Sequence, residues 1–169
     1  PASREYRTAL QILGQARLEL EMWRAAADNF TQLIELSPNV PESYRYRGDA
    51  YLALKQYQQA LDDYERTVIL DPSNSDSYLA RGKGYAENGE FDLAREDFKE
   101  AIRRDPVSSD VYASQGHLFV QTGNPSMAFP DLDRAIEISP LNHDAYFKRA
   151  GAYIELGQPS LALEDLEQA

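Results

Sequence analysis

The sequence predicts an all-α fold, a solenoid of five helix-turn-helix units that covers residues 1–169 as a single domain. Three observations predict it. Prolines recur every 34 residues, small residues recur at the same step in two further columns, and apolar residues between the prolines follow the three- and four-residue spacing of a helix. The expected units span residues 7–40, 41–74, 75–108, 109–142 and 143–169, the last of them cut short.

The proline column marks the end of each unit. Proline has no backbone N–H and disfavours helical backbone at the residue before it, so it ends the second helix and starts the turn into the next unit. The column consists of Pro38, Pro72, Pro106 and Pro140. Breakers near the middle of the units divide each of them into two helices: Lys55-Gln56, Asn88-Gly89, Thr122-Gly123-Asn124 and Leu156-Gly157-Gln158.

Two columns of small residues indicate that the helices of a unit approach each other closely. One column contains Gly14, Gly48, Gly82 and Gly116, and Ala150 completes it. The other contains Ala26, Ala60, Ala94, Ala128 and Ala162. Four residues after each alanine comes a large apolar side chain that fills the space left by the small residues: Phe30, Tyr64, Phe98, Leu132 and Leu166.

These aromatic, glycine, alanine and proline columns at a period of 34 residues resemble the tetratricopeptide repeat. The resemblance covers nearly the whole chain. It implies a right-handed superhelical solenoid in which the first helix of each unit lines a concave groove. It also implies a non-catalytic scaffold for protein–protein interaction that binds a peptide or protein segment in this groove.

One column departs from the family pattern. The leucine that normally precedes the glycine is kept as Leu13, but the later units have Arg47, Arg81, Gln115 and Arg149. Sixteen residues further on, the units carry Asn29, Asp63, Asp97, Asp131 and Asp165. We expect ion pairs that join the two helices of a unit, namely Arg47–Asp63, Arg81–Asp97 and Arg149–Asp165, with Gln115–Asp131 as an imperfect case. The alternative is that the arginines hold a ligand.

Pro130 lies inside the second helix of the fourth unit. It removes the hydrogen bond to the carbonyl of Ser126 and crowds that carbonyl, whereas Pro125 suits a first helical turn. The sequence therefore predicts a kink or a loosened first turn at this point.

The groove positions of the family can be located residue by residue in this chain. They give the candidate peptide-binding residues Arg45, Tyr46, Asp49, Lys83, His117, Phe147 and Lys148. This mixture suits an extended or helical peptide with apolar anchors and some acidic groups. The alternative is a solvated face without a ligand. A clamp for a terminal carboxylate is not expected, because acids stand where its lysine would open the helix: Glu42, Asp76, Asp110 and Asp144.

Composition excludes several other functions. The 28 Asp and Glu against 17 Lys and Arg give a net charge of −11, which disfavours nucleic-acid binding. No apolar run approaches the ~18 residues that span a bilayer. Cysteine is absent, His117 and His143 have no metal-site spacing, and no catalytic triad or phosphate-binding loop is present. We therefore expect no enzyme activity, cofactor or metal. The residues do not indicate a cellular compartment.

The end of the sequence offers an alternative function. It stops at Ala169 in the second helix of the fifth unit, so Leu163 and Leu166 are expected to lack part of their cover. Either further repeats follow in a longer protein, or another copy of the chain packs there. The alternatives to the binding scaffold are thus a homo-oligomer formed through the uncapped C-terminal end, or the interaction domain of a larger enzyme or secretion/assembly factor.

Overall fold

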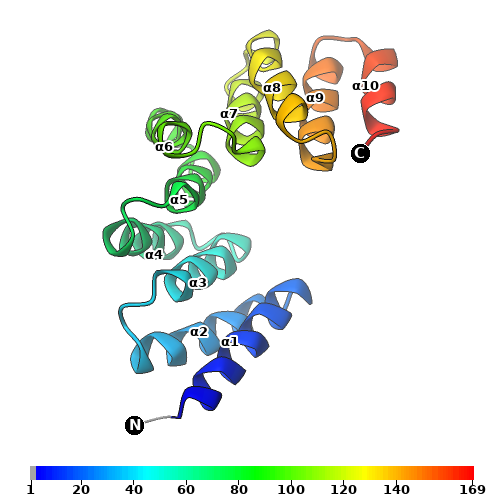
Figure 1. Cartoon of the computed structure of the whole chain (residues 1–169). Helices are drawn as coiled ribbons and strands as arrows, with labels where there is room; N and C mark the ends of the chain where they lie inside the picture. The colour runs from blue at the N-terminus through cyan, green and yellow to red at the C-terminus, as the bar shows by residue number, and fades with distance from the viewer. Residues whose placement is uncertain (1–2) are drawn as a thin grey trace. The chain divides into compact units, whose positions relative to one another are not determined.

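The computed structural model describes residues 3–169, and within that range it contains ten α-helices and one short 3-10 helix. The helices are α1 (Arg4–Glu19), α2 (Trp23–Leu36), α3 (Pro41–Ala53), α4 (Tyr57–Leu70), α5 (Ser75–Glu87), α6 (Phe91–Arg104), α7 (Ser109–Gln121), η1 (Pro125–Met127), α8 (Phe129–Ile138), α9 (His143–Glu155) and α10 (Pro159–Leu166) (Figure 1). The all-helical repeat fold predicted from the sequence is confirmed.

The chain forms two compact units, Pro1–Asn88 and Gly89–Ala169. Their boundary falls between α5 and α6, inside the repeat expected at 75–108. The single domain over 1–169 therefore stays a prediction, and each compact unit is described by itself.

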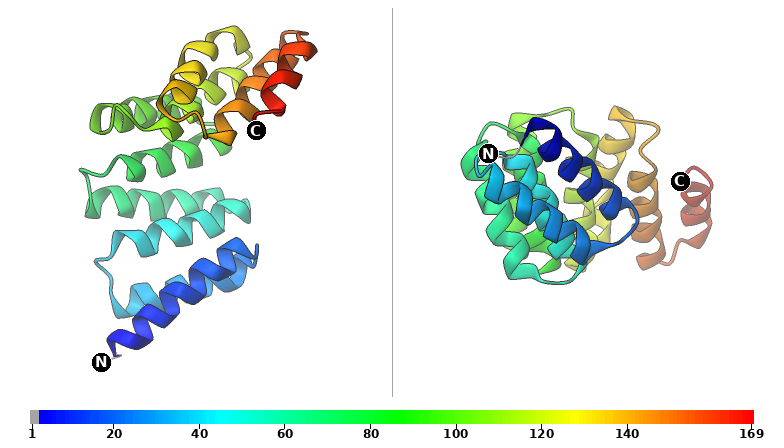
Figure 2. Two further views of the ribbon diagram at one scale, coloured as in Figure 1. Left: turned by 45° about the vertical axis from the view of Figure 1, so that its right-hand side comes forward. Right: turned by 90° about the horizontal axis from the view of Figure 1, so that it is seen from below.

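In the first compact unit, each helix contacts the next one along the chain from α1 to α5 (Figure 2, left). The first helix of each repeat also contacts the first helix of its neighbour, since α3 touches both α1 and α5. The second compact unit repeats this arrangement: α7 contacts α6, α8 and α9, and α9 contacts α8 and α10. Helices α9 and α10, orange and red in Figure 2, lie next to each other. The first helices thus form one layer within each compact unit.

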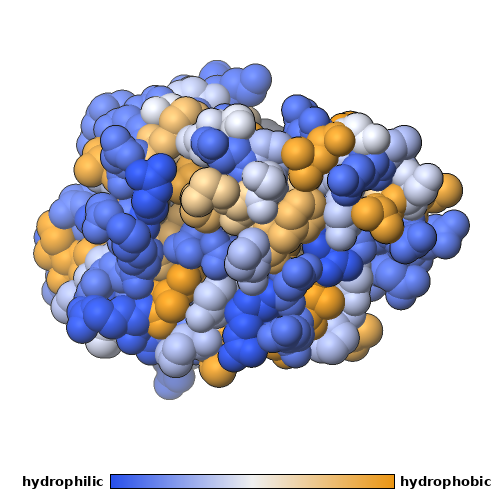
Figure 3. Space-filling model, turned by 90° about the horizontal axis from the view of Figure 1, so that it is seen from above, coloured by the Kyte–Doolittle hydropathy of each residue, from blue (hydrophilic) through white to orange (hydrophobic). Residues whose placement is uncertain are grey.

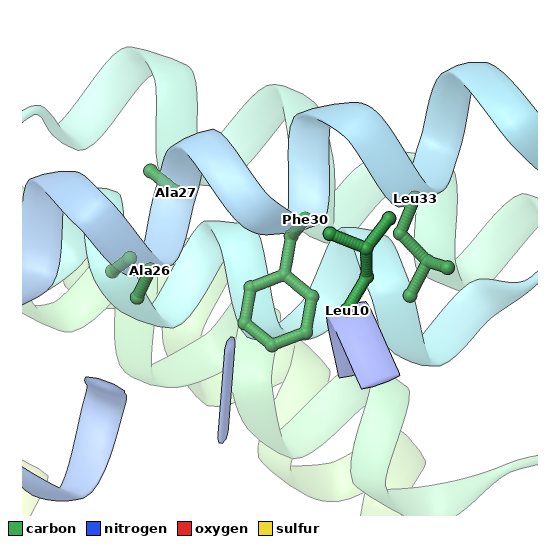
Figure 4. Close-up of a cluster of buried hydrophobic side chains, with 6 residues drawn as sticks. Leu10, Ala26, Ala27, Phe30 and Leu33 are labelled. Carbon is green, nitrogen blue, oxygen red and sulfur yellow. The ribbon is translucent and has the colours of Figure 1, made fainter. Parts of the chain in front are cut away.

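The glycine column fulfils the packing role predicted for it. A Cβ at Gly48 would lie 2.7 Å from Cε1 of Tyr64, and a Cβ at Gly14 would lie 2.7 Å from Cζ of Phe30. Figure 4 shows the cluster around Phe30, in which Leu10 of α1 meets Ala26, Ala27, Phe30 and Leu33 of α2. Only a residue without a side chain allows these fully buried rings to lie against the neighbouring helix.

The turn between the two helices of a repeat has the same backbone conformation throughout the described residues. One residue in each turn has a positive φ, and these residues recur every 34 positions: Glu21 (57°), Lys55 (58°), Gly89 (81°), Gly123 (75°) and Gly157 (69°). Glycine adopts this conformation without strain, whereas Glu21 and Lys55 carry a side chain there at some cost in free energy.

The loosened turn predicted at Pro130 is confirmed. Residues Pro125–Met127 form a 3-10 turn, and α8 begins only at Phe129, with Pro130 in its first turn. As a result α8 has 10 residues, whereas α4 and α6 have 14 each. The proline falls where its missing N–H would have no helical partner in any case.

Candidate functional site

The ion pairs predicted between the two helices of a repeat are present where the structure describes them. Arg47 donates through Nε to Oδ2 of Asp63 at 2.8 Å and through Nη2 to Oδ1 at 2.7 Å. Arg149 grips Asp165 in the same bidentate way, at 2.8 and 2.6 Å. The hydrogen bonds to Asp63 raise the pKa of Arg47 above its ordinary value.

Each of these arginines also reaches the second helix of the preceding repeat. The Nη1 atom of Arg47 donates to Oγ1 of Thr31 at 3.1 Å, and that of Arg149 donates to Oδ1 of Asp133 at 2.7 Å. Arg81 makes the corresponding contact with Glu65. One guanidinium therefore joins three helices. The Arg81–Asp97 pair would cross between the two compact units and stays a prediction.

This geometry favours a packing role for the arginines over a ligand-binding one. The side chains of Arg47 and Arg149 are only 18% and 19% exposed, and their partners Asp63 and Asp165 are 6% exposed. A ligand would have to displace an existing bidentate hydrogen-bonded pair in order to bind there.

In two repeats a different pair of residues takes the place of the arginine–aspartate pair between the helices. In the first repeat the guanidinium comes from Arg17, one turn after Leu13, and donates to Oδ1 of the buried Asn29. In the fourth repeat Gln115 donates from Nε2 to Asp131 at 2.9 Å, and its Oε1 atom is buried without a hydrogen-bond partner. Burial raises the pKa of Asp131, and the hydrogen bond from Gln115 acts in the opposite direction.

The predicted groove residues of the first compact unit lie together. The guanidinium of Arg45 lies 4.2 Å from the ring centre of Tyr46, and that ring stacks on Phe30 with the two centres 5.2 Å apart. Nη1 of Arg45 is 3.2 Å from Oδ2 of Asp49. The side chains of Arg45 and Asp49 remain 30% and 37% exposed, so both are accessible to a ligand.

A residue that sequence reasoning did not include completes this group. The hydroxyl of Tyr64 donates to Oδ1 of Asp49 at 2.9 Å. Burial raises the pKa of Asp49, and the positive charges of Arg45 and Lys83 and the hydrogen bond from Tyr64 act in the opposite direction. The signal was present in the sequence, because Tyr64 carries the only hydroxyl in a column otherwise made of Phe30, Phe98, Leu132 and Leu166.

We call Arg45, Tyr46, Asp49, Tyr64 and Lys83 the α3–α5 cluster. It contains two cations and one carboxylate in a chain whose net charge is −11. The ring of Tyr46 lies beneath the guanidinium of Arg45, and within the cluster the cations outnumber the carboxylate, an arrangement that suits a negatively charged group.

The predicted residues of the second compact unit lie on the adjacent helices α7 and α9. Phe147 of α9 is 64% exposed, which is unusual for a large aromatic side chain. Lys148 forms an ion pair with Asp144, and its side chain is 15% exposed. His117 lies on α7 and is half-buried.

In the space-filling view, hydrophobic residues (orange) lie in separate patches among hydrophilic ones (Figure 3).

A polar cavity of about 420 Å³ lies where the turns before α7 and α9 meet. Its polar groups bind one another: Nδ2 of Asn142 donates to Oγ of Ser109 at 2.6 Å and to Oδ1 of Asp110 at 2.9 Å, and Ser109 donates to the carbonyl of Ala135 at 2.8 Å. These hydrogen bonds tie two successive repeats together, and we assign the cavity a structural role.

Residues 3–169 contain neither a metal-binding cluster nor a membrane-spanning helix. No group of three or more His, Cys, Asp or Glu side chains there could hold a metal ion. No helix in that range has the length and apolar content required to cross a membrane.

Stacked helix pairs, repeated small residues and a fixed period define a helical-repeat protein. A family model of the tetratricopeptide repeat matches residues 13–75 and 79–143, and a second model of the same repeat matches 132–164. The chain therefore belongs to the tetratricopeptide repeat family, whose members are generally non-catalytic modules that bind protein or peptide partners.

Solved structures agree on the fold. The chain is similar to TTC0263, a thermophilic tetratricopeptide repeat protein of Thermus thermophilus, with a TM-score of 0.89 and 21% identity over 96% of this chain and 91% of that one. It is similar to MamA, from residue 41 to the end, of Desulfovibrio magneticus, with a TM-score of 0.72 and 15% identity over 99% and 94%.

A third similar structure is YrrB, described as a tetratricopeptide repeat protein with an unusual peptide-binding site. Its TM-score is 0.60, with 18% identity over 92% of this chain and 80% of that one. A comparison with curated proteins finds no match.

Proposed function

We propose that the protein is a non-catalytic scaffold that binds peptide segments along its first helices, with an acidic group bound in the first compact unit and an apolar anchor bound in the second. The observation that carries the proposal is the α3–α5 cluster, where Arg45 lies over Tyr46 and keeps part of its side chain exposed beside Asp49. Membership of a family that binds protein or peptide partners supports it, as does the peptide-binding site described for the similar protein YrrB.

The acidic group would bind at Arg45 and Lys83. Arg45 is preorganised, because its guanidinium lies over the ring of Tyr46 and forms an ion pair with Asp49. An incoming carboxylate can approach the exposed part of the guanidinium and gain a charge-assisted hydrogen bond. Little side-chain entropy remains to be lost on binding, since the arginine is already oriented.

The apolar anchor would bind at Phe147. An exposed aromatic side chain on a first helix offers a large contact area, and burying it against a partner releases water from apolar surface. His117 and Lys148 would flank this anchor as polar contacts. Aromatic residues are enriched at the points that dominate interface energetics.

Selection from a random peptide display library tests the proposal. The wild-type protein should enrich two features among the selected peptides, namely Asp or Glu for the first compact unit and an aromatic or aliphatic residue for the second. A variant with Arg45→Gln and Lys83→Gln should lose the acidic preference, and Phe147→Ala should lose the apolar one. We avoid Tyr46→Ala, because Tyr46 stacks on the buried Phe30 and its loss would also weaken packing between α2 and α3.

The matched control removes the same two charges elsewhere. Lys99→Gln with Arg103→Gln changes two exposed cations on α6, a second helix, and should leave the selected peptides unchanged. Absence of any enrichment, or the same enrichment for the cluster variant and the wild type, would contradict the proposal.

A further inference from the structure

Helix α1 exposes an apolar face within the described structure. Ile12 is 61% exposed and Leu13 is 44% exposed, and the small residues Ala9 and Ala16 on the same face are also exposed. The opposite face of the helix is buried, with Leu10 and Gly14 against α2.

The repeat shows what such a face normally contacts. One repeat later, the residues equivalent to Ala9, Ile12, Leu13 and Ala16 are Ser43, Tyr46, Arg47 and Ala50. Tyr46 stacks on Phe30 of α2, Arg47 donates to Thr31 of α2, and Ala50 belongs to the buried cluster of Ala26, Ala27 and Phe30. This face of a first helix is therefore the one that receives the second helix of the preceding repeat.

Helix α10 exposes the complementary face. Leu163 is 58% exposed and Leu166 is 43% exposed. Their equivalents in α2 are Ala27 and Phe30, which are 4% and 0% exposed against α3 (Figure 4).

Helix α8 confirms what this face of a second helix contacts. Its residues Phe129 and Leu132 are equivalent to Leu163 and Leu166. The ring of Phe129 lies 4.7 Å from that of Tyr153 in α9, and Leu132 clusters with Ala152 of α9. This face of a second helix is therefore the one that receives the first helix of the following repeat.

We infer that the chain self-associates head to tail, with α1 of a second copy covering α10 of the first. The contact would continue the packing that joins α2 to α3 and α8 to α9 inside the chain. Ile12 of one copy would lie near Leu166 of the other, as Tyr46 lies on Phe30, and Ala16 would lie near Leu166 as Ala152 lies near Leu132. Charge favours the same pairing: α1 carries three arginines and two glutamates, a net +1, whereas residues 159–169 carry Glu164, Asp165 and Glu167, a net −3.

The pairing differs from an internal repeat junction at one position. In α1 of the second copy, Leu13 stands at the position where most other repeats have an arginine. The guanidinium that would contact Glu167 of the first copy is therefore missing. Glu65 and Asp133, the equivalents of Glu167, each receive such an arginine inside the chain. We therefore expect reversible association that grows with concentration. Because the two contacting faces differ, each pair of copies still exposes one α1 face and one α10 face, and further copies can add to them.

Sedimentation equilibrium of the 169-residue chain over a wide concentration range tests the inference. The wild type should show an average mass that rises continuously above 19.1 kDa with concentration. Ile12→Glu and Leu163→Glu each block one end, so either variant alone should stay at the monomer mass. Both residues are largely exposed, and neither substitution should disturb the fold.

An equal mixture of the Ile12→Glu and Leu163→Glu variants gives the most specific result, because only one contact between the two variants remains possible. The Ile12→Glu copy still offers α10 and the Leu163→Glu copy still offers α1, so the mixture should form dimers and stop at twice 19.1 kDa. Val107→Glu adds the same charge at a 63% exposed residue in the turn between α6 and α7, and should associate like the wild type.

Three results would overturn the inference. They are a wild type that remains monomeric at the highest concentration, an Ile12→Glu variant that still associates through α10 alone, and a mixture that stays monomeric. Peptide binding by the α3–α5 cluster does not depend on any of these outcomes, so the two proposals can fail separately.

Discussion

The repeats at 41–74 and 109–142 have the same period and columns but are held together differently. In the first, Arg47 grips Asp63 and reaches Thr31, and α4 runs for 14 residues. In the second, Gln115 replaces the arginine, its Oε1 atom has no partner, and α8 runs for only 10 residues after a 3-10 turn. Both nevertheless place their helices in the same order of contact.

The comparison shows which parts of the repeat are essential to the fold. The glycine and alanine columns are kept in both repeats, with Gly48 and Gly116 each lying against a buried side chain. The arginine and the full-length second helix are replaced in one repeat without loss of the fold. Apolar packing through small residues therefore sets the arrangement, and the guanidinium adds stability and joins neighbouring repeats.

The largest effect is expected from Arg47→Met. Removing the guanidinium leaves the Asp63 carboxylate, 6% exposed, buried without its partner, and should lower the free energy of unfolding by about 3–5 kcal/mol. Gln115→Met removes a single hydrogen bond and should cost only about 1 kcal/mol. Urea unfolding followed by circular dichroism measures both.

A double substitution is the control for Arg47. Arg47→Met combined with Asp63→Leu leaves no buried charge and should recover most of the lost stability. Equal losses for Arg47→Met and Gln115→Met would show that the two repeats do not differ in the way described.

The next effect concerns the glycine column. Gly48→Ala places a Cβ 2.7 Å from the ring of Tyr64, which its hydrogen bond to Asp49 holds in place, and should destabilise by about 1–3 kcal/mol. Gly151→Ala is the matched control, because a Cβ added there would meet nothing within 4 Å and alanine favours a helix interior. That variant should gain about 0.5–1 kcal/mol in thermal unfolding. A tolerated Gly48→Ala would argue against close packing as the reason for the column.

Gln115→Arg should make the fourth repeat resemble the second. The new guanidinium would face Asp131, whose pKa is raised by burial, and should stabilise the protein by about 1 kcal/mol at neutral pH. The same substitution combined with Asp131→Asn should gain nothing. If the gain persists in that double variant, as thermal unfolding would reveal, then a pair with Asp131 is not its cause.

The smallest effect is expected in the turns. The repeat at 41–74 has Lys55 at the positive-φ position where the repeat at 109–142 has Gly123. Relieving a left-handed residue that costs about 1–2 kcal/mol outweighs the entropy lost by glycine, so Lys55→Gly should stabilise by about 0.5 kcal/mol. Gly123→Ala should destabilise. Calorimetry of both variants checks the sign, and a destabilised Lys55→Gly would contradict the explanation.

Much of the fold could be predicted because it depends on local rules repeated at a fixed interval. The 34-residue columns located the helix pairs and the Arg47–Asp63 and Arg149–Asp165 pairs, and a proline inside an expected helix located the loosened turn at Pro130. Each of these depends on residues in one repeat, where spacing along two adjacent helices determines which side chains meet.

What could not be predicted depends on contacts that cross columns or repeats. The hydrogen bond from Arg47 to Thr31 depends on the angle between successive repeats. The 34-residue period of the sequence does not specify that angle. The hydrogen bond from Tyr64 to Asp49 joins a packing column to a groove column. The hydrogen bond to Asn29 comes from Arg17 and not from residue 13. Predicting it would require knowing how far a guanidinium extends along the helix.

Titration calorimetry with one peptide from the library selection tests the central claim, that packing columns hold the fold while groove columns bind the partner. Arg45→Gln should weaken peptide binding at least tenfold, about 1.4 kcal/mol, and leave the melting temperature unchanged. Arg47→Met, two residues away on the same helix, should lower the melting temperature and leave the affinity of the folded protein unchanged. Loss of affinity in Arg47→Met together with full affinity in Arg45→Gln would contradict it.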